Sequence, residues 1–548
     1  MWWNPSMATT VEKVTFKNYR SYGPAGATLD LTNQFTAIVG TNNTGKTTLL
    51  RSFWELRPVY EYLKNLGPGN PELHQLCLGG NFRQLQLLGG ERVFSKIDVG
   101  STPRIRIDFR NDEKNASSIE FVEIVLLENN GRLLLEFGLA NGPQVVKPNA
   151  VTYGMNNGRD HLFFTYPDGH QEYVDWIPAQ GAFTVLFDTF YIGAFRNAIN
   201  SGEAQLYDMQ VGRGFVNSFD SFRNGIDSEQ NEAANQMARE LGEIFGFEDF
   251  QVNVASTNDH LACIVNGKSY RGTELGAGIT QFIIVAVNVL VRKPSILLID
   301  EPELNLHASL QSRFLELLAK YTLGPVIYST HSFGLARTTA DEILISTRDS
   351  SQRSLLKPYH AESNLSFVLG ELGYGGYQDT SFKGVLLVEG VTEVRAMKKL
   401  LGKFGSRGDF VVIPLGGDAM AIGDREQELA ELRMLSHKVF AIVDSERTSA
   451  KDSPKQARVD FLAACENQGI ECLVLERRAL ENYMDLDSAR RVFNKPNALD
   501  FGEFDKPDIS WEWRKNRNWR IVELMEKEHF EETDLGRFVS NMLTSIAN

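Results

Sequence analysis

The pattern of apolar and polar positions predicts a β-rich first half that is interrupted by a helical segment. Residues 11–39 alternate apolar and polar side chains, which indicates half-buried strands, and the chain then enters a predicted helix at Gly45. Between about 95 and 195, short alternating runs separated by Asn, Gly and Asp turns predict further strands. Residues 203–247 are polar and helix-favouring, so they predict either an inserted arm that dimerises or a pair of surface helices.

The second half of the chain predicts strands that alternate with helices. Strand character returns at Gln251–Val265 and in the wholly apolar run Ile296–Asp300. The Gly- and Tyr-rich segment Leu369–Phe382 has weak patterning and is the best candidate for a linker. Beyond it, the strand-like runs GVLLVEG, FVVIPLGG, KVFAIVDS and IECLVLE alternate with helical stretches. This order predicts an α/β domain with a largely parallel sheet.

Length and composition indicate a soluble protein of several domains. The chain has 548 residues, and because single cores stop growing near roughly 250–300 residues, two or three domains are expected. No apolar run approaches the roughly 20 residues that cross a bilayer, and the beginning MWWNPSMATT lacks the order of a secretory signal. We therefore expect a cytoplasmic protein with no membrane contact. The four cysteines lack CxxC spacing, so buried free thiols are expected.

The net charge of −14 argues against a protein that coats nucleic acid through its overall charge. It does not exclude DNA as a partner, because local basic stretches can contact phosphates. The densest basic and aromatic cluster is WEWRKNRNWR at Trp511–Arg520. Either it contacts DNA, or it is a solvated helix face that carries core tryptophans.

The segment GTNNTGKT at Gly40–Thr47 matches the phosphate-binding loop GxxxxGK[ST]. Its glycines let backbone N–H groups surround phosphate oxygens, its lysine neutralises phosphate charge, and its hydroxyl binds Mg²⁺. ATP with Mg²⁺ is the predicted ligand. The predicted contacts in the loop are Gly40, Asn43, Gly45, Lys46, Thr47 and Thr48.

Two further elements of a nucleotide site follow in the expected order. Asp300 ends a buried strand, where its carboxylate suits Mg²⁺ together with Thr47, and the adjacent Glu301 is placed to polarise the attacking water. His331 follows the strand-like run VIYST and is placed to sense the γ-phosphate.

Two pairs of acidic residues follow consecutive apolar strands in the second half. Glu389 ends VLLVE and Glu393 lies four residues later in a predicted helix, so both carboxylates face one side. Asp444 and Glu446 stand two apart after FAIVD, which directs them to a common side. Oxygen ligands of this kind suit Mg²⁺ or Mn²⁺, and two ions about 4 Å apart activate water and stabilise a leaving oxygen.

The motifs FKNYRSY, GTNNTGKTT, ELGAGITQ, LLIDEPELNLH and STHS resemble the ABC-class ATPases of DNA repair and chromosome maintenance. That resemblance implies a homodimer or higher oligomer in which the signature of one chain, here with Gly276 and Gly278, closes on ATP bound to the other. The usual LSGGQ-like serine is absent from Leu275–Gly278, which favours slow hydrolysis and a ligand switch. The glutamine-loop residue stays unassigned, with Gln84 and Gln86 as candidates.

The acidic block resembles a TOPRIM domain, in which a glutamate follows the first strand and a DxD pair comes later; here Glu446 replaces the second aspartate. LERRALENYM resembles the further acidic motif of TOPRIM nucleases, which implies that Glu481 is a metal ligand or supports one. The joined architecture is similar to the OLD (overcoming lysogenisation defect) family of endonucleases. The catalytic lysine of that family corresponds to Arg520, with Lys515 as the alternative; an arginine stabilises charge but cannot donate a proton at neutral pH.

The expected fold class is α/β: an ABC-class P-loop ATPase domain at 1–375 with a helical insert near 200–250, followed by a Rossmann-like TOPRIM domain at 380–548. The resemblance implies an ATP-regulated, metal-dependent DNA endonuclease of antiphage defence, with a helicase or a reverse transcriptase and its nucleic acid as a regulator from the same operon. The alternative is a nucleotide-dependent DNA-binding or assembly protein with vestigial acids. A topoisomerase or primase is a third option, but no segment indicates a cleavage domain with a nucleophilic tyrosine.

Overall fold

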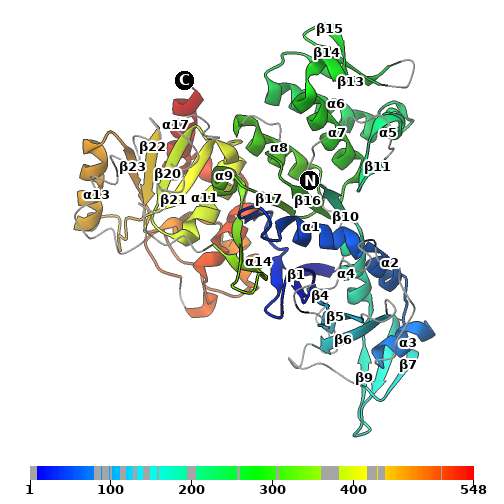
Figure 1. The fold of residues 1–548 in the computed structure, drawn as a ribbon. Coiled ribbons are helices and arrows are strands. Elements are labelled where there is room, and N and C mark those ends of the chain that lie inside the picture. The colour runs from blue at the N-terminus through cyan, green and yellow to red at the C-terminus, as the bar shows by residue number, and fades with distance from the viewer. Residues whose placement is uncertain are drawn as a thin grey trace. The chain divides into compact units, whose positions relative to one another are not determined.

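The described chain forms two compact units. The computed structural model describes residues 9–78, 88, 98, 101–111, 119–127, 132–139, 148–156, 159–193, 205–255, 260–303, 308–359, 382–415, 429, 438–507 and 509–547 (Figure 1). The first unit comprises 1–306, 314–331 and 340–359, and the second comprises 307–313, 332–339 and 360–548. Of the predicted linker Leu369–Phe382, all residues but Phe382 lie outside the described part of the chain.

A six-stranded sheet in the order β10-β16-β17-β3-β18-β19 is the centre of the first unit. All neighbouring strands in it are parallel except β18 and β19. Every residue of β3, β16 and β17 is buried, as expected of parallel strands covered on both faces. The strands are β3 (Phe35–Val39), β10 (Thr189–Ile192), β16 (Ile296–Asp300), β17 (Val326–Thr330), β18 (Glu342–Arg348) and β19 (Ser354–Pro358).

Two antiparallel sheets of this unit contain most of the strands expected between 95 and 195, but residues 183–187, also expected to be a strand, lie in the helix α4 (Ile177–Phe187). The five-stranded sheet has the order β2-β1-β4-β5-β6, and the three-stranded sheet has the order β7-β8-β9. Their inner side chains share one hydrophobic core with α1, α2 and α4. The strands are β1 (Thr9–Lys17), β2 (Ala27–Asp30), β4 (Arg104–Asn111), β5 (Ile119–Leu127), β6 (Arg132–Leu139), β7 (Ala150–Asn156), β8 (Arg159–Thr165) and β9 (Gln171–Val174).

The predicted helical insert is present as the helix pair α5 (Gly212–Asn224) and α6 (Ser228–Phe245). Asp227 caps α6 by accepting hydrogen bonds from the N–H groups of Glu229 and Gln230, and Gly246 ends the helix in the left-handed conformation. A role of this pair in dimerisation stays a prediction. The neighbouring short strands are β11 (Gln205–Leu206), β12 (Met209–Gln210), β13 (Phe250–Val254), β14 (Leu261–Val265) and β15 (Lys268–Arg271).

Seven further α helices lie between residues 46 and 339 in the described part of the chain. The α helices are α1 (Lys46–Glu55), α2 (Arg57–Lys64), α3 (Pro71–Cys77), α4 (Ile177–Phe187), α7 (Ala277–Arg292), α8 (Ala308–Lys320) and α9 (Phe333–Thr339). Within the described residues, no helix has the length and apolar character that crossing a membrane requires. All four cysteines are free thiols, and three of them are buried.

The second unit contains a four-stranded parallel sheet in the order β21-β20-β22-β23 (Figure 1). Alternate residues of β20 enter different cores: Leu386 and Val388 belong to one, and Val385 and Leu387 belong to the other. The sheet is therefore covered on both faces. The strands are β20 (Gly384–Val388), β21 (Phe410–Pro414), β22 (Val439–Val443) and β23 (Glu471–Val474).

Helices of the second unit pack against this sheet, and the helices that follow β23 form the C-terminal part of the unit. The α helices are α11 (Val391–Lys403), α13 (Gln456–Asn467), α14 (Leu486–Phe493), α15 (Asn518–Leu524), α16 (Glu528–Glu531) and α17 (Asp534–Ala547). Because β20 and β22 are parallel neighbours, their carboxyl ends meet at one edge of the sheet. Residues that directly follow these two strands are thus brought together.

Candidate nucleotide and metal sites

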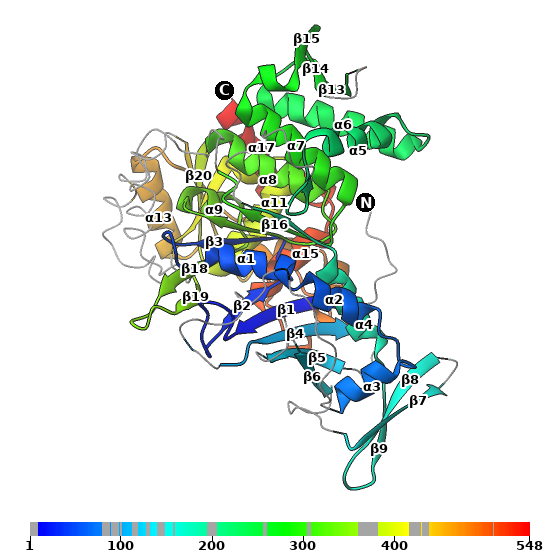
Figure 2. The ribbon, with the colours of Figure 1, turned by 45° about the vertical axis from the view of Figure 1, so that its right-hand side comes forward.

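The phosphate-binding loop lies between the end of β3 and the start of α1, which runs beside the sheet (Figure 2). Gly45 has φ = 106°, and a Cβ atom there would lie 2.5 Å from the Ser354 hydroxyl oxygen. A Cβ atom at Gly40 would lie 2.3 Å from the Ser346 carbonyl oxygen. The close approach of β18 and β19 therefore requires glycine at both positions.

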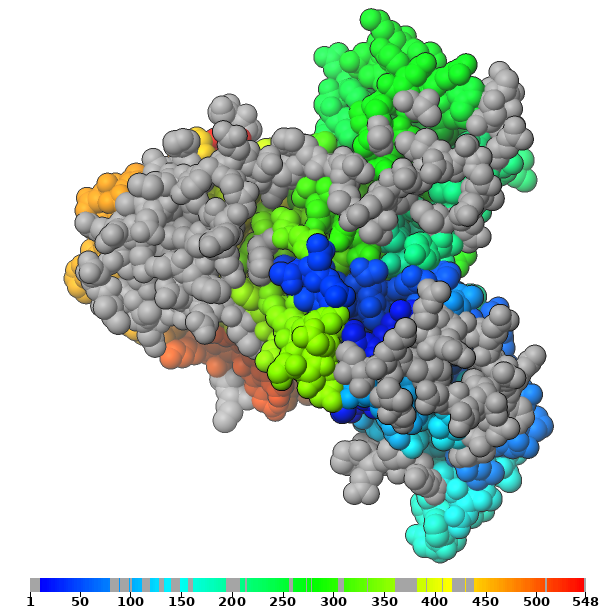
Figure 3. Space-filling model, in the orientation of Figure 1, coloured from blue at the N-terminus to red at the C-terminus, as the bar shows by residue number. Residues whose placement is uncertain are grey.

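The space-filling view shows residues of 340–359 directly beside the first 50 residues (Figure 3). Tyr22 donates a hydrogen bond to the Gly45 carbonyl, and the Ser21 and Ser354 hydroxyls are 2.8 Å apart. Asn43 has φ = 68° and is held by Arg348, which donates to its backbone and side-chain oxygens at 2.6 and 3.0 Å. These contacts fix the loop, including one residue in a strained conformation.

Lys46 lies across the loop and close to the acidic end of the neighbouring strand. Its Nζ donates hydrogen bonds to the carbonyl oxygens of Gly40 and Thr41 at 2.8 and 2.9 Å. The same atom is 3.3 Å from His331 Nε2. Burial lowers the pKa of Lys46, while the charges of Glu301 and Asp300 act in the opposite direction. Lys46 therefore lies between the phosphate-binding loop and the acidic residues Asp300 and Glu301, where it could contact a bound phosphate group.

Asp300 is buried at the end of β16, and the Ser329 hydroxyl donates a hydrogen bond to its Oδ1. Burial raises the pKa of Asp300, and hydrogen bonds from Ser329 and Thr47 lower it. Its Oδ2 is buried without a hydrogen-bond partner among the described residues. A carboxylate next to a threonine hydroxyl, with one buried oxygen unsatisfied, fits the hard oxygen ligands that Mg²⁺ requires.

Glu301 and His331 face each other at this edge. Glu301 Oε1 is 3.3 Å from His331 Nε2, so the imidazole lies within reach of both Glu301 and Lys46. Glu301 has φ = 54°, which is unusual for a residue with a side chain. Its N–H donates to the Ser329 carbonyl and hydroxyl oxygens at 3.1 and 3.2 Å. Strain of this kind is concentrated at functional positions.

Glu303 is a residue of this site that the sequence reasoning missed. Its Oε1 accepts hydrogen bonds of 2.8 Å from the Thr330 hydroxyl and from the backbone N–H of His331. It therefore fixes the end of β17 from which the histidine projects. The repeated acid in DEPE is the only sequence signal that could have revealed it.

The signature glycines lie at the start of α7. Gly276 has φ = 91° and ψ = 152°, a conformation that residues with side chains rarely adopt. The Thr280 hydroxyl donates a hydrogen bond to its carbonyl oxygen. Gly278 lies in the first turn of the helix. The glutamine-loop candidates Gln84 and Gln86 lie outside the described residues.

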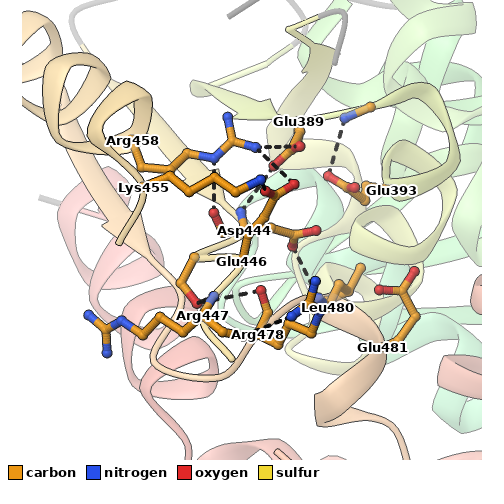
Figure 4. Close-up of polar contacts among 12 residues, drawn as sticks. Glu389, Glu393, Asp444, Glu446, Arg447, Lys455, Arg458, Arg478, Leu480 and Glu481 are labelled. Carbon is orange, nitrogen blue, oxygen red and sulfur yellow. Dashed lines mark hydrogen bonds and ion pairs between the residues drawn. The ribbon is translucent and has the colours of Figure 1, made fainter. Parts of the chain in front are cut away.

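In the second unit, Glu389 and Asp444 follow β20 and β22 and are in direct contact (Figure 4). Glu389 Oε2 accepts a hydrogen bond of 3.2 Å from the N–H of Asp444. Asp444 Oδ1 in turn accepts one of 3.1 Å from the N–H of Leu480. Parallel pairing of the two strands therefore brings together two acids that are 55 positions apart in the sequence.

Glu393 and Glu481 lie on the other side of Asp444 from Arg458 in Figure 4. Glu393 is in the first turn of α11, and its Oε2 accepts a hydrogen bond of 3.2 Å from the Gly390 N–H. Glu481 belongs to the 3-10 helix Leu480–Tyr483, and Asn518 donates a hydrogen bond of 3.0 Å to its Oε1. Both glutamates are buried.

The four acids act on one another electrostatically. Burial, followed by the charge of Glu389, raises the pKa of Glu393 from 4.5 to about 7. Burial and the charges of Glu393, Glu481 and Glu389 raise the pKa of Asp444. Taking carboxylates out of water costs several kcal/mol unless positive charge compensates them. The cluster is consequently a place where a cation is favoured.

Three cationic side chains border the cluster. Lys515 Nζ is 3.2 Å from Glu481 Oε1, and its charge lowers the pKa of both Glu393 and Asp444. Arg458 contacts Glu389 at 2.6 Å, and Lys455 forms an ion pair with Glu446. Glu446 is thus turned toward Lys455 and Arg458, and it has the unusual φ of 53°.

The acids fit a metal ion by their chemistry, but they are not arranged as a finished metal centre. Among the described residues, no three His, Cys, Asp or Glu side chains are close enough together to hold one ion. Mg²⁺ and Mn²⁺ accept such oxygen ligands together with waters, so a site completed by water is consistent with this spacing. A bound ion would have to draw the carboxylates of Glu393, Asp444 and Glu481 closer together than they lie in this structure, with Glu389 beside them.

Trp511–Arg520 divides into core tryptophans and exposed basic residues. Trp511 and Trp519 are buried, and the Trp511 Nε1 donates a hydrogen bond of 2.7 Å to the Leu499 carbonyl. Lys515 reaches the acidic cluster from the 3-10 helix Lys515–Arg517. The Arg520 guanidinium lies 5.2 Å above the Trp519 ring. Lys515, the alternative assignment, thus contacts the acidic cluster, and which of the two residues acts in catalysis stays a prediction.

Comparisons with known proteins find ATPase-domain models in two segments of the chain. A family model described as "AAA ATPase domain" matches residues 10–131, and one described as "AAA domain, putative AbiEii toxin, Type IV TA system" matches residues 274–337. These two matches contain the phosphate-binding loop and the segment from the signature glycines to His331. No protein of curated function matches the sequence.

Solved structures that match the chain include head domains of SMC proteins. The SMC head domain from Thermotoga maritima is 12% identical, with a TM-score of 0.32, and the match covers 64% of this chain and 99% of that one. An Smc head with an extended coiled coil, bound to the C-terminal domain of ScpA from Pyrococcus furiosus, is 12% identical, with a TM-score of 0.31, and covers 66% and 98%. The two family matches, together with the phosphate-binding loop beside a largely parallel sheet, show a nucleotide-binding P-loop ATPase domain of α/β fold.

Proposed function

We propose that the protein is an ATP-controlled, divalent-metal-dependent DNA endonuclease of the OLD type, in which a TOPRIM nuclease domain at 380–548 follows an ABC-class ATPase domain at 1–375. The observation that carries this proposal is the convergence of four carboxylates, three of them buried and that of Glu389 half-buried, at the carboxyl edge of a parallel sheet. This cluster lies on the same chain as a P-loop ATPase site. The combination suits phosphodiester hydrolysis that depends on nucleotide.

Each side chain of the cluster has a role in this proposal. Glu393, Asp444 and Glu481 hold Mg²⁺ or Mn²⁺, which when bound would activate water and stabilise developing negative charge. Glu389 orients Asp444 through the hydrogen bond to its N–H. Lys515, in place of Arg520, carries the positive charge that stabilises the leaving oxygen, and unlike arginine it can also donate a proton.

In the ATPase unit, Lys46 neutralises phosphate charge, Thr47 and Asp300 hold Mg²⁺, and Glu301 orients the attacking water. His331 senses the γ-phosphate from its position between Lys46 and Glu301. Gly276 and Gly278 contact nucleotide bound to a second copy of the chain, so the active form is a homodimer. The missing signature serine makes this a slow ATPase that acts as a ligand switch.

The test is cleavage of supercoiled plasmid by purified protein in Mn²⁺, with EDTA and with Asp444→Ala as controls. We expect nicked product in Mn²⁺ and none in either control. A structured RNA is incubated in parallel, because cleavage of RNA alone would contradict the DNA assignment. DNA binding without cleavage would favour the alternative of a nucleotide-dependent DNA-binding or assembly protein. Antiphage defence, with a helicase or reverse transcriptase as regulator, is supported by the family resemblance alone.

A further inference from the structure

Arg458 is a buried arginine that reaches into the acidic cluster from α13. Its side chain is 9% exposed, and its Nη2 lies 2.6 Å from Glu389 Oε1 and 3.8 Å from Glu446 Oε1. Its Nε donates a hydrogen bond of 3.1 Å to the Asp444 carbonyl oxygen. One guanidinium therefore touches three of the residues that the nuclease proposal concerns. The guanidinium group of an arginine carries a positive charge at neutral pH.

The position of Arg458 divides the cluster into two halves. Glu389 and Glu446 face Arg458 and Lys455, whereas Glu393 and Glu481 lie on the opposite side of Asp444 (Figure 4). The first pair already has cationic partners within the protein. The other side is formed by Glu393, Asp444 and Glu481, where Lys515 is the cationic neighbour.

The formal charges agree with this division. Glu389, Glu393, Asp444, Glu446 and Glu481 carry five negative charges if all are ionised. Arg458, Lys455 and Lys515 bring three positive charges into contact with them. Two negative charges remain uncompensated, which is the charge of one divalent cation. A second divalent ion would have to share Glu389 and Glu446 with a guanidinium that is buried and cannot lose its proton.

We propose, on the basis of the nuclease function proposed above, that Arg458 is a built-in cation that takes the place of a second metal ion. The nuclease centre then holds one Mg²⁺ or Mn²⁺ per chain, on the side of Glu393, Asp444 and Glu481. Arg458 is a positioning residue: it neutralises Glu389, so that this glutamate keeps its hydrogen bond to the Asp444 N–H. Replacement of the family's second aspartate by Glu446 fits this arrangement, since the longer side chain reaches Lys455 and Arg458.

The experiment counts Mn²⁺ ions by the electron paramagnetic resonance signal of free Mn²⁺, in titrations of the full-length protein without nucleotide. Ions bound elsewhere, such as at Asp300, are subtracted by titrating Asp444→Ala in parallel. We expect wild type to bind one more Mn²⁺ per chain than Asp444→Ala. Two more would overturn the inference and leave the nuclease proposal standing. No difference would overturn the proposed metal site itself.

Variants of Arg458 test whether its charge excludes the second ion. Arg458→Met should gain one Mn²⁺ per chain, while Arg458→Lys should keep the wild-type count because it retains the positive charge. Arg490→Met is the matched control, because Arg490 pairs with Asp487 and Asp500 in the same unit. An unchanged count in folded Arg458→Met would contradict the role of Arg458. If that variant does not fold, the wild-type count still decides the stoichiometry.

Discussion

Replacing Glu393 with glutamine should stabilise the metal-free protein at alkaline pH, although it removes a proposed metal ligand. Glu393 is buried, and its pKa rises from 4.5 to about 7 because burial, and then the charge of Glu389, disfavour the ionised form. Glutamine keeps the side-chain oxygen that accepts the hydrogen bond from Gly390 but carries no charge. The substitution therefore removes only the negative charge, and its effect on the free energy of unfolding measures the cost of burying that charge.

The pKa shift gives both the size and the sign of the effect. One pKa unit corresponds to about 1.4 kcal/mol, so the ionised glutamate costs the folded state about 3 kcal/mol. As the pH rises from 4.5 to about 7, the unfolded chain loses this proton while the folded chain still holds it. The free energy of unfolding of the wild type therefore falls across this window.

The assay is urea unfolding in EDTA, followed by near-ultraviolet circular dichroism at about pH 5 and about pH 8. The free energy of unfolding of Glu393→Gln minus that of wild type should increase by roughly 2 to 3 kcal/mol from about pH 5 to about pH 8. Glu466→Gln, which changes an exposed glutamate on α13, should show no such growth. Parallel pH profiles for wild type and Glu393→Gln would refute the electrostatic account of the cluster.

Three further predictions concern the nucleotide site and the acid that replaces the family's second aspartate. Lys46→Ala should weaken ATP binding. Glu301→Gln should bind ATP normally and lower the rate of ATP hydrolysis by about a hundredfold or more, because a general base contributes that much to the rate. Equal rates of hydrolysis in wild type and Glu301→Gln would contradict the assignment of Glu301 as the base. Glu303→Gln should leave the Kd for ATP unchanged and lower turnover by about tenfold, because the end of β17 that carries His331 loses a charged hydrogen-bond acceptor; an equal loss of binding would indicate a general disruption. Glu446→Asp should retain DNA cleavage, because Glu446 pairs with Lys455 and Arg458, and a complete loss would show that the longer side chain is essential.

Elements with strong local signals could be predicted from the sequence. The apolar runs of β16, β17, β20 and β22 are buried throughout, so their composition alone indicates covered parallel strands. The glycines of the phosphate-binding loop and the acids that end these strands follow from local chemistry. Parallel pairing then determines that Glu389 and Asp444 meet.

The positions that the sequence did not reveal depend on contacts between distant segments. Arg458 lies on a helix without a motif, and its contact with Glu389 spans 69 positions. Lys515 was predicted only as the alternative to Arg520, and its contact with Glu481 depends on the short 3-10 helix that precedes α15. Glu303 acquires its role only when β16 and β17 pair and bring Thr330 close to it. Local patterns carry no information on such contacts.

The central claim is that nucleotide bound at the P-loop controls a metal-dependent nuclease on the same chain. The most direct measurement is the rate of plasmid cleavage in Mn²⁺ without nucleotide and with ATP, ADP or a non-hydrolysable ATP analogue, for wild type and Lys46→Ala. A ligand shifts a conformational equilibrium only through its different affinities for the two states, so coupling must appear as a rate that depends on the nucleotide. We predict such a dependence in wild type and its loss in Lys46→Ala; identical rates for wild type in every condition would contradict the claim.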